Sequence, residues 1–261
     1  MIMTEKEVLI SHARELKEKC AVMSVVTFTN FLTIEEKSSL SVLKSENSKY
    51  VNTFYYGGYS EAERCVAVFV PEFYKADSVA EFFKEYPEEN PLAVIKAEKD
   101  KFTNMTHRDF LGSLMALGLK REMLGDIIVT DYGCCFFCLK NMASFIVENL
   151  KRTGRGSVEC KIIDFSKLPD NSDKCEYVFS SLPSLRLDAV VSAAFSLSRS
   201  KSSEFISKGV VYVNDTECLK NDMTLDEGSK IVLRGKGKVI LNRINGLSKK
   251  GRIHAEFKKF K

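Results

Sequence analysis

Hydroxyl and basic side chains alternate in the C-terminal third of the chain, in the segment Ser198-Arg199-Ser200-Lys201-Ser202. We expect a short helix to begin here and to end at Gly209, a residue free to take the left-handed conformation. The N-terminus of a helix presents unpaired N–H groups and the positive end of the helix dipole, and both suit phosphate. Arginine can also bind phosphate through two hydrogen bonds or stack on a base. The pattern therefore predicts an anion-binding site.

Further basic residues extend this predicted site through the C-terminal segment. They are Arg186, Lys208, Arg234, Lys236 and Lys238, followed by Lys249, Lys250 and Arg252. Each of them alone is more typical of a solvated surface charge. Taken together with the serine-rich helix start, they favour RNA as the ligand.

The charge of the chain is unevenly distributed. The sequence has 39 Lys and Arg against 35 Asp and Glu, a net charge of +4. Residues 181–261 hold 16 of the basic and 8 of the acidic residues, which leaves 23 basic and 27 acidic residues in the first 180. From Lys230 onward there are eleven basic residues and a single acid, Glu256. A basic module joined to a mildly acidic body indicates a polyanionic partner, and nucleic acid is favoured over a membrane because this segment lacks a clear apolar face.

The eight cysteines do not form a recognisable metal site. Only Cys135 and Cys138 have CxxC spacing, and a zinc ribbon or finger needs a second ligand pair. The run Tyr132–Leu139 is expected to be a strand, whose alternation would send these two thiols to opposite faces. We therefore expect packing cysteines in a reducing compartment, with no metal and no cofactor.

The order of the expected elements indicates three small α+β domains. Residues 1–72 are expected to fold as helices at 4–20 and 33–47 followed by strands at 50–56 and 65–70. Residues 73–165 show the order β-α-β-β-α-β of ferredoxin-like and RRM domains. A linker is expected at 166–181, and residues 182–261 are expected to form two helices, a small sheet and a basic tail.

The middle segment is a weaker candidate for RNA binding. RRM domains stack bases on aromatic residues of their central strands. Tyr132, Phe136 and Phe137 lie on the corresponding strand, but Asp131 stands where a basic residue would be expected. Packing in the core is the favoured interpretation of these aromatic side chains.

No apolar run approaches the roughly 20 residues that span a bilayer. The first residues, Met1–Glu7, show neither a basic region nor a following apolar stretch. We therefore expect a cytoplasmic protein without membrane contact, and a monomer.

The C-terminal segment resembles the S-four-type RNA-binding domain over about 50 residues. The resemblance rests on Arg186-Leu187-Asp188, Ser198-Arg199, Phe205-Ile206, Gly209, Val211-Val213-Asn214 and Gly228-Ile231. The sequence departs from the pattern at Ser202, where alanine is usual, and at Asp215, where glycine is usual. Asp215 implies a slightly less favourable hairpin turn. The RNA-binding residues expected within this domain include Ser202 and Asn214 as well as the serine, arginine and lysine residues named above.

The whole chain resembles the YlmH family of bacterial proteins. The residues that carry this likeness are Tyr56-Gly57-Gly58-Tyr59, Glu61-Ala62-Glu63-Arg64, Thr106–Gly112, Gly125-Asp126-Ile127 and the terminal Arg234–Lys238 and Lys249–Arg252. The resemblance implies a non-catalytic protein that binds rRNA or tRNA on the large ribosomal subunit. It also implies a role in quality control of stalled nascent chains.

Two alternative functions stay open. S-four-type domains often accompany pseudouridine synthases, which use an aspartate in an Arg-Leu-Asp motif. Asp188, however, lies within the expected S-four-type helix, where we expect it to orient Arg186 or to favour the helix N-terminus. A methyltransferase or nucleotide hydrolase would need a glycine-rich loop that is missing, and His12, His107 and His254 are scattered. The second alternative is a protein-interaction adaptor in cell division.

Overall fold

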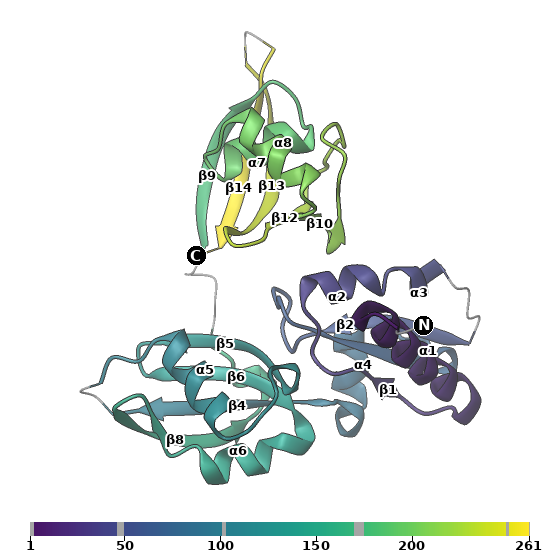
Figure 1. The fold of residues 1–261 in the computed structure, drawn as a ribbon, viewed down its shortest axis with the longest axis vertical. Helices are drawn as coiled ribbons and strands as arrows, with labels where there is room; N and C mark the ends of the chain where they lie inside the picture. The colour runs from purple at the N-terminus through teal and green to yellow at the C-terminus, as the bar shows by residue number, and fades with distance from the viewer. Residues whose placement is uncertain (1–2, 46–49, 101–102, 170–174, 249–250, 261) are drawn as a thin grey trace. The chain divides into compact units, whose positions relative to one another are not determined.

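The computed structural model describes residues 3–45, 50–100, 103–169, 175–248 and 251–260. It shows a mixed α/β protein that divides into two compact units, Met1–Pro169 and Asp170–Lys261. The first unit contains a three-stranded and a five-stranded sheet, and the second contains a six-stranded sheet (Figure 1).

The first part of unit 1 packs helix α1 against a small antiparallel sheet. Its elements are α1 (Glu5–Met23), β1 (Thr27–Phe28), α2 (Ile34–Ser39), α3 (Val42–Ser45), β2 (Val51–Tyr56) and β3 (Val66–Pro71), with strand order β1-β3-β2. Thr4 and Thr33 cap α1 and α2, each paired with a glutamate three residues on, so both helix starts follow from local sequence. Ala13 and Cys20 of α1 are fully buried in a cluster with Phe69 of β3. The first expected helix and both expected strands are confirmed, whereas the helix expected at 33–47 is divided into α2 and α3, and β1 was not expected.

Three short helices connect this sheet to the next and were not expected from the sequence. They are η1 (Glu72–Tyr74), α4 (Val79–Glu85) and η2 (Pro87–Glu89). Ser78 caps α4, and Phe82 and Phe83 of this helix are buried. The connection therefore contributes side chains to the core of unit 1.

The second part of unit 1 has the predicted order β-α-β-β-α-β, with one additional short strand. Its elements are β4 (Leu92–Lys99), α5 (His107–Ala116), η3 (Arg121–Met123), β5 (Leu124–Thr130), β6 (Gly133–Leu139), η4 (Lys140–Met142), α6 (Ala143–Asn149), β7 (Arg152–Thr153), β8 (Gly156–Ile163) and η5 (Phe165–Lys167). The antiparallel sheet has the order β5-β6-β4-β8-β7. Its first four strands have the order of a ferredoxin-like sheet, which confirms the RRM-like arrangement.

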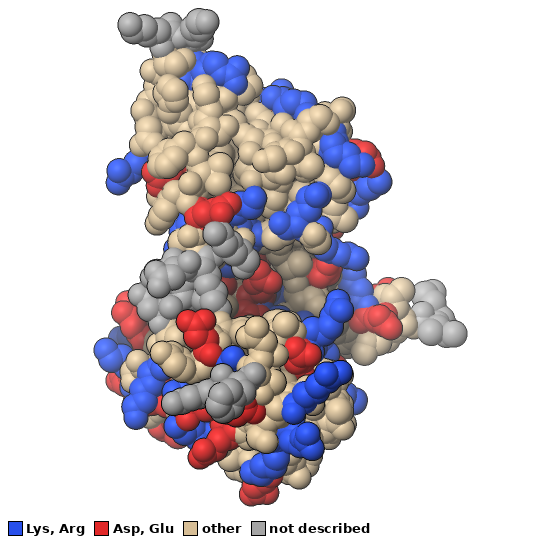
Figure 2. Space-filling view, turned by 90° about the vertical axis from the view of Figure 1, so that its left-hand side faces the viewer, with Lys and Arg blue, Asp and Glu red and all other residues tan. Residues whose placement is uncertain are grey.

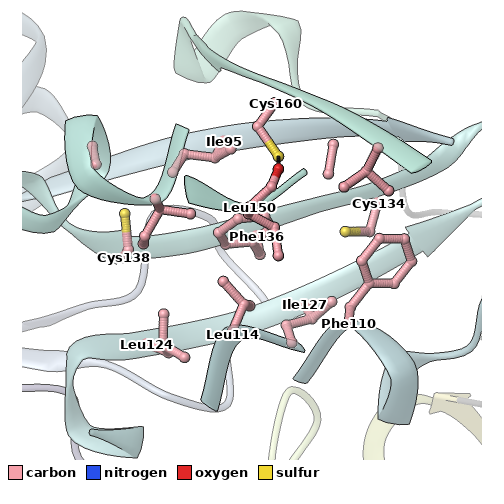
Figure 3. Close-up of a cluster of buried hydrophobic side chains, with 14 of the residues drawn as sticks. Ile95, Phe110, Leu114, Leu124, Ile127, Cys134, Phe136, Cys138, Leu150 and Cys160 are labelled. Carbon is pink, nitrogen blue, oxygen red and sulfur yellow. Dashed lines mark hydrogen bonds between the residues drawn. The ribbon is translucent and has the colours of Figure 1, made fainter. Parts of the chain in front are cut away.

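The two faces of this sheet pack against different elements. Ile95 and Phe136 point toward α5 and α6, where they join Phe110 and Ile146 in one core (Figure 3). Alternate residues point the other way, and Phe137 joins a second core with Val68 of β3 and Phe82 of α4. Both sheets thus belong to one compact unit, and the expected boundary between residues 72 and 73 lies inside it.

Unit 2 covers one face of a six-stranded antiparallel sheet with two helices. Its elements are β9 (Cys175–Leu182), α7 (Leu187–Ala194), α8 (Arg199–Ser207), β10 (Val211–Val213), β11 (Thr216–Glu217), β12 (Lys230–Leu233), β13 (Gly237–Leu247) and β14 (Ile253–Phe260), in the order β11-β10-β12-β13-β14-β9. Val190 of α7 and Ile206 of α8 are fully buried against Leu233, Leu241 and Phe257 of the sheet. The expected pair of helices followed by a sheet is confirmed.

Two boundaries predicted for this part of the chain are wrong. The predicted linker at 166–181 ends earlier, because residues 175–182 form β9, which pairs with β14 along its whole length. The predicted basic tail is a hairpin of two long strands, β13 and β14. In both cases the strand is held by a partner distant in sequence, whereas the linker and tail were inferred from turn residues and charge alone.

Candidate nucleic-acid interface

The two helices of unit 2 bring Arg186 and Arg199 to one carboxylate. Arg186 precedes α7 and Arg199 opens α8. The side chain of Asp188 accepts from Arg199 at 2.6 Å and from Arg186 Nε at 3.3 Å. Asp188 also accepts from the amide of Ala189 at 2.9 Å. The carboxylate thus fixes two guanidinium groups beside each other, as the sequence predicted for Arg186.

The electrostatics of this cluster keep Asp188 ionised. Burial of Asp188 raises the pKa of its carboxyl, but hydrogen bonds from Arg199 and Arg186 outweigh burial, so the pKa is lowered. The side chain of Asp188 is 8% exposed, whereas those of Arg186 and Arg199 are 46% and 47% exposed. Each guanidinium carries five N–H donors, so both retain donors that can reach an anion in solvent.

A second cluster lies on the following turns of α8. Ser198 caps the helix by accepting from the amide of Lys201 at 3.2 Å. Glu204 binds Lys201 at 2.9 Å and Lys208 at 2.6 Å, and hydrogen bonds from Lys208 and Lys201 lower the pKa of Glu204 to about 2. Glu204 was not predicted from the sequence as part of this site, although its spacing of three and four residues from the two lysines is the signal for such pairs.

Two predicted RNA-binding residues, Ser202 and Lys238, do not present their side chains to solvent. Ser202 is fully buried and donates to the carbonyl of Ser198, so its predicted contact with RNA is wrong: the small side chain fits the α8 core position where alanine is usual. Lys238 is 4% exposed, and its ammonium lies 4.1 Å from the centroid of the Phe260 ring. Its predicted contact is also wrong, because the side chain is buried. The burial was not foreseen because Phe260 comes from β14, a strand the sequence did not predict.

Asn214 has a structural position in the β10–β11 hairpin. Asn214 and Asp215 have φ of 49° and 65°, the conformation of a tight two-residue hairpin turn. The side chain of Asn214 accepts from the amide of Lys230, and Asp215 pairs with the ammonium of Lys230 at 2.7 Å. This ion pair offsets part of the cost of placing aspartate where glycine is usual.

The remaining basic residues are separated from the arginine pair. Arg234 and Lys236 are exposed in the turn after β12, and the amide of Arg234 donates to the carbonyl of Val210, just beyond the C-terminal end of α8. A nine-residue helix is about 13 Å long, so this turn and Arg199 lie at opposite ends of α8. Arg252 is exposed and donates to Ser181. Lys249 and Lys250 lie outside the described residues.

The family-like residues of unit 1 hold its two sheets together. Tyr59 donates to Asp126 at 2.9 Å, and the amides of Glu63 and Arg64 donate to the same carboxylate. The Arg64 guanidinium donates to the carbonyls of Leu124, Phe31 and Arg121. These bonds satisfy three carbonyls at the junction of β5 with the N-terminal part. The segment from Tyr56 to Arg64 is therefore explained by packing, without an RNA ligand.

The surface that RRM domains use for bases is buried in this chain. Tyr59 stacks on Phe137 with ring centroids 5.3 Å apart, and Gly58 lies against the same ring. Phe136 packs under the helices on the opposite face. The prediction that Phe136 and Phe137 belong to the core is confirmed, whereas Tyr132 is exposed at the β5–β6 turn.

Seven of the eight cysteines are buried, as the sequence predicted, and Cys175 is partly exposed. Cys135 and Cys138 belong to the cores on opposite faces of the sheet, and both are free thiols. Burial raises the pKa of Cys138 to about 12 and that of Cys160 to about 11. Among the described side chains there is no group of three or more histidine, cysteine, aspartate or glutamate residues placed to hold a metal ion.

The histidine at the start of α5 is exposed beside a local capping motif. Thr106 accepts from the amide of Asp109, and Asp109 accepts from the amide of Thr106 at 2.8 Å. This reciprocal cap accounts for Thr106 and Asp109 and leaves His107 on the surface.

Within the described ranges, no helix is long and apolar enough to cross a membrane.

Comparisons with known proteins agree with the motifs. A family model described as "Putative RNA-binding domain in YlmH" matches residues 89–167. The chain is 30% identical to "Ribosome-associated protein quality control protein P2" of Bacillus subtilis (strain 168) over 260 residues. The match covers 98% of this chain and 96% of the relative. A solved structure named "Cell division protein ylmH from Streptococcus pneumoniae" is 17% identical, covers 65% of this chain and 98% of its own, and gives a TM-score of 0.49. With 30% identity to a relative over nearly the full length of both chains, this chain belongs to the YlmH family that its motifs resemble.

Proposed function

We propose that the protein is a non-catalytic, monomeric and cytoplasmic RNA-binding protein that binds rRNA or tRNA on the large ribosomal subunit during quality control of stalled nascent chains. The name of the B. subtilis relative supports the ribosomal role. The observation that carries the proposal is the arginine pair of unit 2, in which Asp188 holds Arg186 and Arg199 together at the starts of two helices.

The arginine pair would bind the RNA backbone. Because Asp188 already orders both side chains, less conformational entropy is lost when they meet phosphate. Lys201 and Lys208 add two ammonium groups on the next turns of α8. Phosphate contacts of this kind fix position on RNA without reading sequence, which suits recognition of a particular ribosomal site by shape.

The buried cores indicate which domain of the chain binds RNA. We propose three domains, an N-terminal α+β domain, an RRM-like domain and an S-four-type domain, of which the last binds RNA most strongly. The sheet of the RRM-like domain is covered on both faces. Any RNA contact made by residues 89–167 would therefore use loops and helices rather than stacking on the sheet.

The environment of Asp188 supports a binding role over catalysis. A pseudouridine synthase would use its aspartate as a nucleophile that must reach a base. Asp188 is 5% exposed and accepts from two arginines and an amide, so it cannot approach a substrate without losing these bonds. We propose that its function is to position the arginines.

The test is sedimentation of lysate through a gradient at low and moderate salt. We compare the intact chain with the double variant Arg199→Ala, Lys201→Ala. A matched control is Lys6→Ala, Lys19→Ala, which removes two exposed positive charges from α1. We expect the intact chain and the control to migrate with large subunits and the α8 variant to stay near the top.

The salt dependence of RNA binding gives a second measure. Losing two phosphate contacts should reduce the slope of log K against log salt by about 1.4 to 1.8. An unchanged slope would contradict the assignment of Arg199 and Lys201. An intact chain that remains at the top of the gradient at both salt concentrations would contradict the ribosomal role.

A further inference from the structure

The sheet of unit 2 has a second face, which α7 and α8 do not cover. The strand register separates the two faces: Val178 and Phe257 are paired and belong to the helix-covered core. Their neighbours in each strand point to the opposite side, because side chains alternate along a strand. On β9 these outward residues are Tyr177 and Phe179.

This outward face displays aromatic side chains. Tyr177 is 53% exposed and Phe179 is 69% exposed, and they stand two positions apart on the edge strand β9. Phe260 of β14 has the same orientation, since it pairs with Cys175 two positions before Tyr177. Edge strands more often carry charge than exposed rings, because exposed apolar edges promote aggregation. The two exposed rings, with the partly exposed Phe260 on the same face, therefore indicate a surface with a ligand.

The charges on the same face are mostly positive. Lys258 pairs with Tyr177 across β9 and β14, and its ammonium lies 5.1 Å from the centroid of Phe260. Arg243 is exposed on β13 opposite Glu256, whose carboxylate accepts from Asn242. In Figure 2 the face of unit 2 on the β9 side is largely uncharged, with Lys and Arg groups and a few Asp and Glu groups at its margins.

We propose that this face binds unpaired bases of RNA, with Tyr177 and Phe179 of its edge strand as the stacking rings. Successive bases would stack on the two rings, while Lys258 and Arg243 meet the phosphates. Rings interleaved with basic side chains match a single-stranded nucleic acid better than a protein strand, which would need only the free backbone edge of β9. The proposal takes its ligand class from the proposed function but assigns a separate site, on the face opposite α7 and α8.

The chain contains no tryptophan, so a single introduced tryptophan reports on its own surroundings. In Phe179→Trp we titrate the full-length protein with an unstructured oligouridylate and follow the fluorescence. The matched control is Phe73→Trp, at a ring 61% exposed in unit 1. We expect quenching and saturation for the tryptophan at 179, and no saturable change for the one at 73.

A second variant measures the contribution of stacking. Tyr177→Leu with Phe179→Leu keeps the strand apolar and should weaken oligouridylate binding by roughly 5- to 150-fold per base lost. Duplex RNA of the same length should bind this variant and the intact chain equally. Equal oligouridylate affinities for both proteins would overturn the proposal.

The outcomes separate this site from the arginine pair. Quenching at position 179 that survives Arg199→Ala, Lys201→Ala supports an independent base-binding face, even if ribosome association has failed. Unquenched fluorescence at low salt overturns it. The proposal is also overturned if the tryptophan at position 179 shows the emission of a solvent-shielded side chain in the free protein, because the face would then be occupied by another part of the protein.

Discussion

The substitution Asp188→Asn separates the orientation of the arginines from their charge. It keeps the size of the buried side chain and removes the negative charge that Arg186 and Arg199 share. The protein becomes more positive by one charge, so simple attraction predicts tighter binding to RNA. If the function of Asp188 is to hold the two guanidinium groups in place, binding should instead become weaker.

The two opposing effects can be compared in size. Losing the order of two long side chains costs about 0.5–1.5 kcal/mol each on binding, or roughly 5- to 150-fold in affinity for the pair. The removed charge acts the other way by about 1 kcal/mol at 4 Å in water, less with salt. We therefore expect a net weakening of several-fold. The free energy of unfolding should fall by about 1–2 kcal/mol, because hydrogen bonds to charged groups are lost but the arginines are half exposed and screened.

The assay is binding of purified large ribosomal subunits to the labelled protein at several salt concentrations. Asp222→Asn is the matched control, since it removes an exposed negative charge from the same unit. We expect Asp222→Asn to bind as tightly as the intact chain or slightly more tightly. If Asp188→Asn behaves in the same way as this control while remaining folded, the orienting function assigned to Asp188 is refuted.

Three further expectations follow from the geometry. Gly58→Ala should lower the free energy of unfolding by about 2 kcal/mol or more, because the φ of Gly58 is +94° and an added Cβ would lie 2.4 Å from the Phe137 ring. A urea unfolding curve equal to that of the intact chain would contradict this expectation. In the native protein a thiol reagent should modify the partly exposed Cys175 before Cys138, because burial raises the pKa of Cys138 to about 12. Equal rates of modification of the two thiols would show that β6 is not buried. The stability difference between the intact chain and Asp188→Asn should be constant above about pH 5 and shrink at lower pH, because the folded-state pKa of Asp188 is lowered. Calorimetry from pH 7 to pH 3 measures this difference.

Local signals in the sequence were sufficient for most elements of the fold. Threonine and serine residues at positions 4, 33 and 198 cap the helices that they were expected to begin. These caps act within one turn, so neighbouring residues determine them. The β-α-β-β-α-β order was also predictable, because each strand is bounded by turn residues and each helix has an apolar stripe.

Contacts distant in sequence account for what the sequence did not predict. β9 is held by β14, with Phe179 paired to Glu256 across 77 residues. The alternation of Tyr177, Val178 and Phe179 was a signal for a strand, but the preceding Pro169–Asp173 segment indicated a linker. Lys238 was expected at the surface because of its charge, and its burial depends on Phe260 of another strand.

In this chain, a residue that carries the likeness to the family need not belong to a binding site. Tyr59, Arg64 and Asp126 carry much of the likeness in unit 1, yet their bonds are made to one another and to backbone groups. A surface for RNA must instead offer donors or rings that remain open to solvent. In unit 2 the half-exposed arginines beside Asp188 meet this condition, and so do Tyr177 and Phe179 on the opposite face of the sheet. Because the two surfaces share no residue, substitutions in one should leave the other able to bind, and only their combination should remove RNA binding by unit 2.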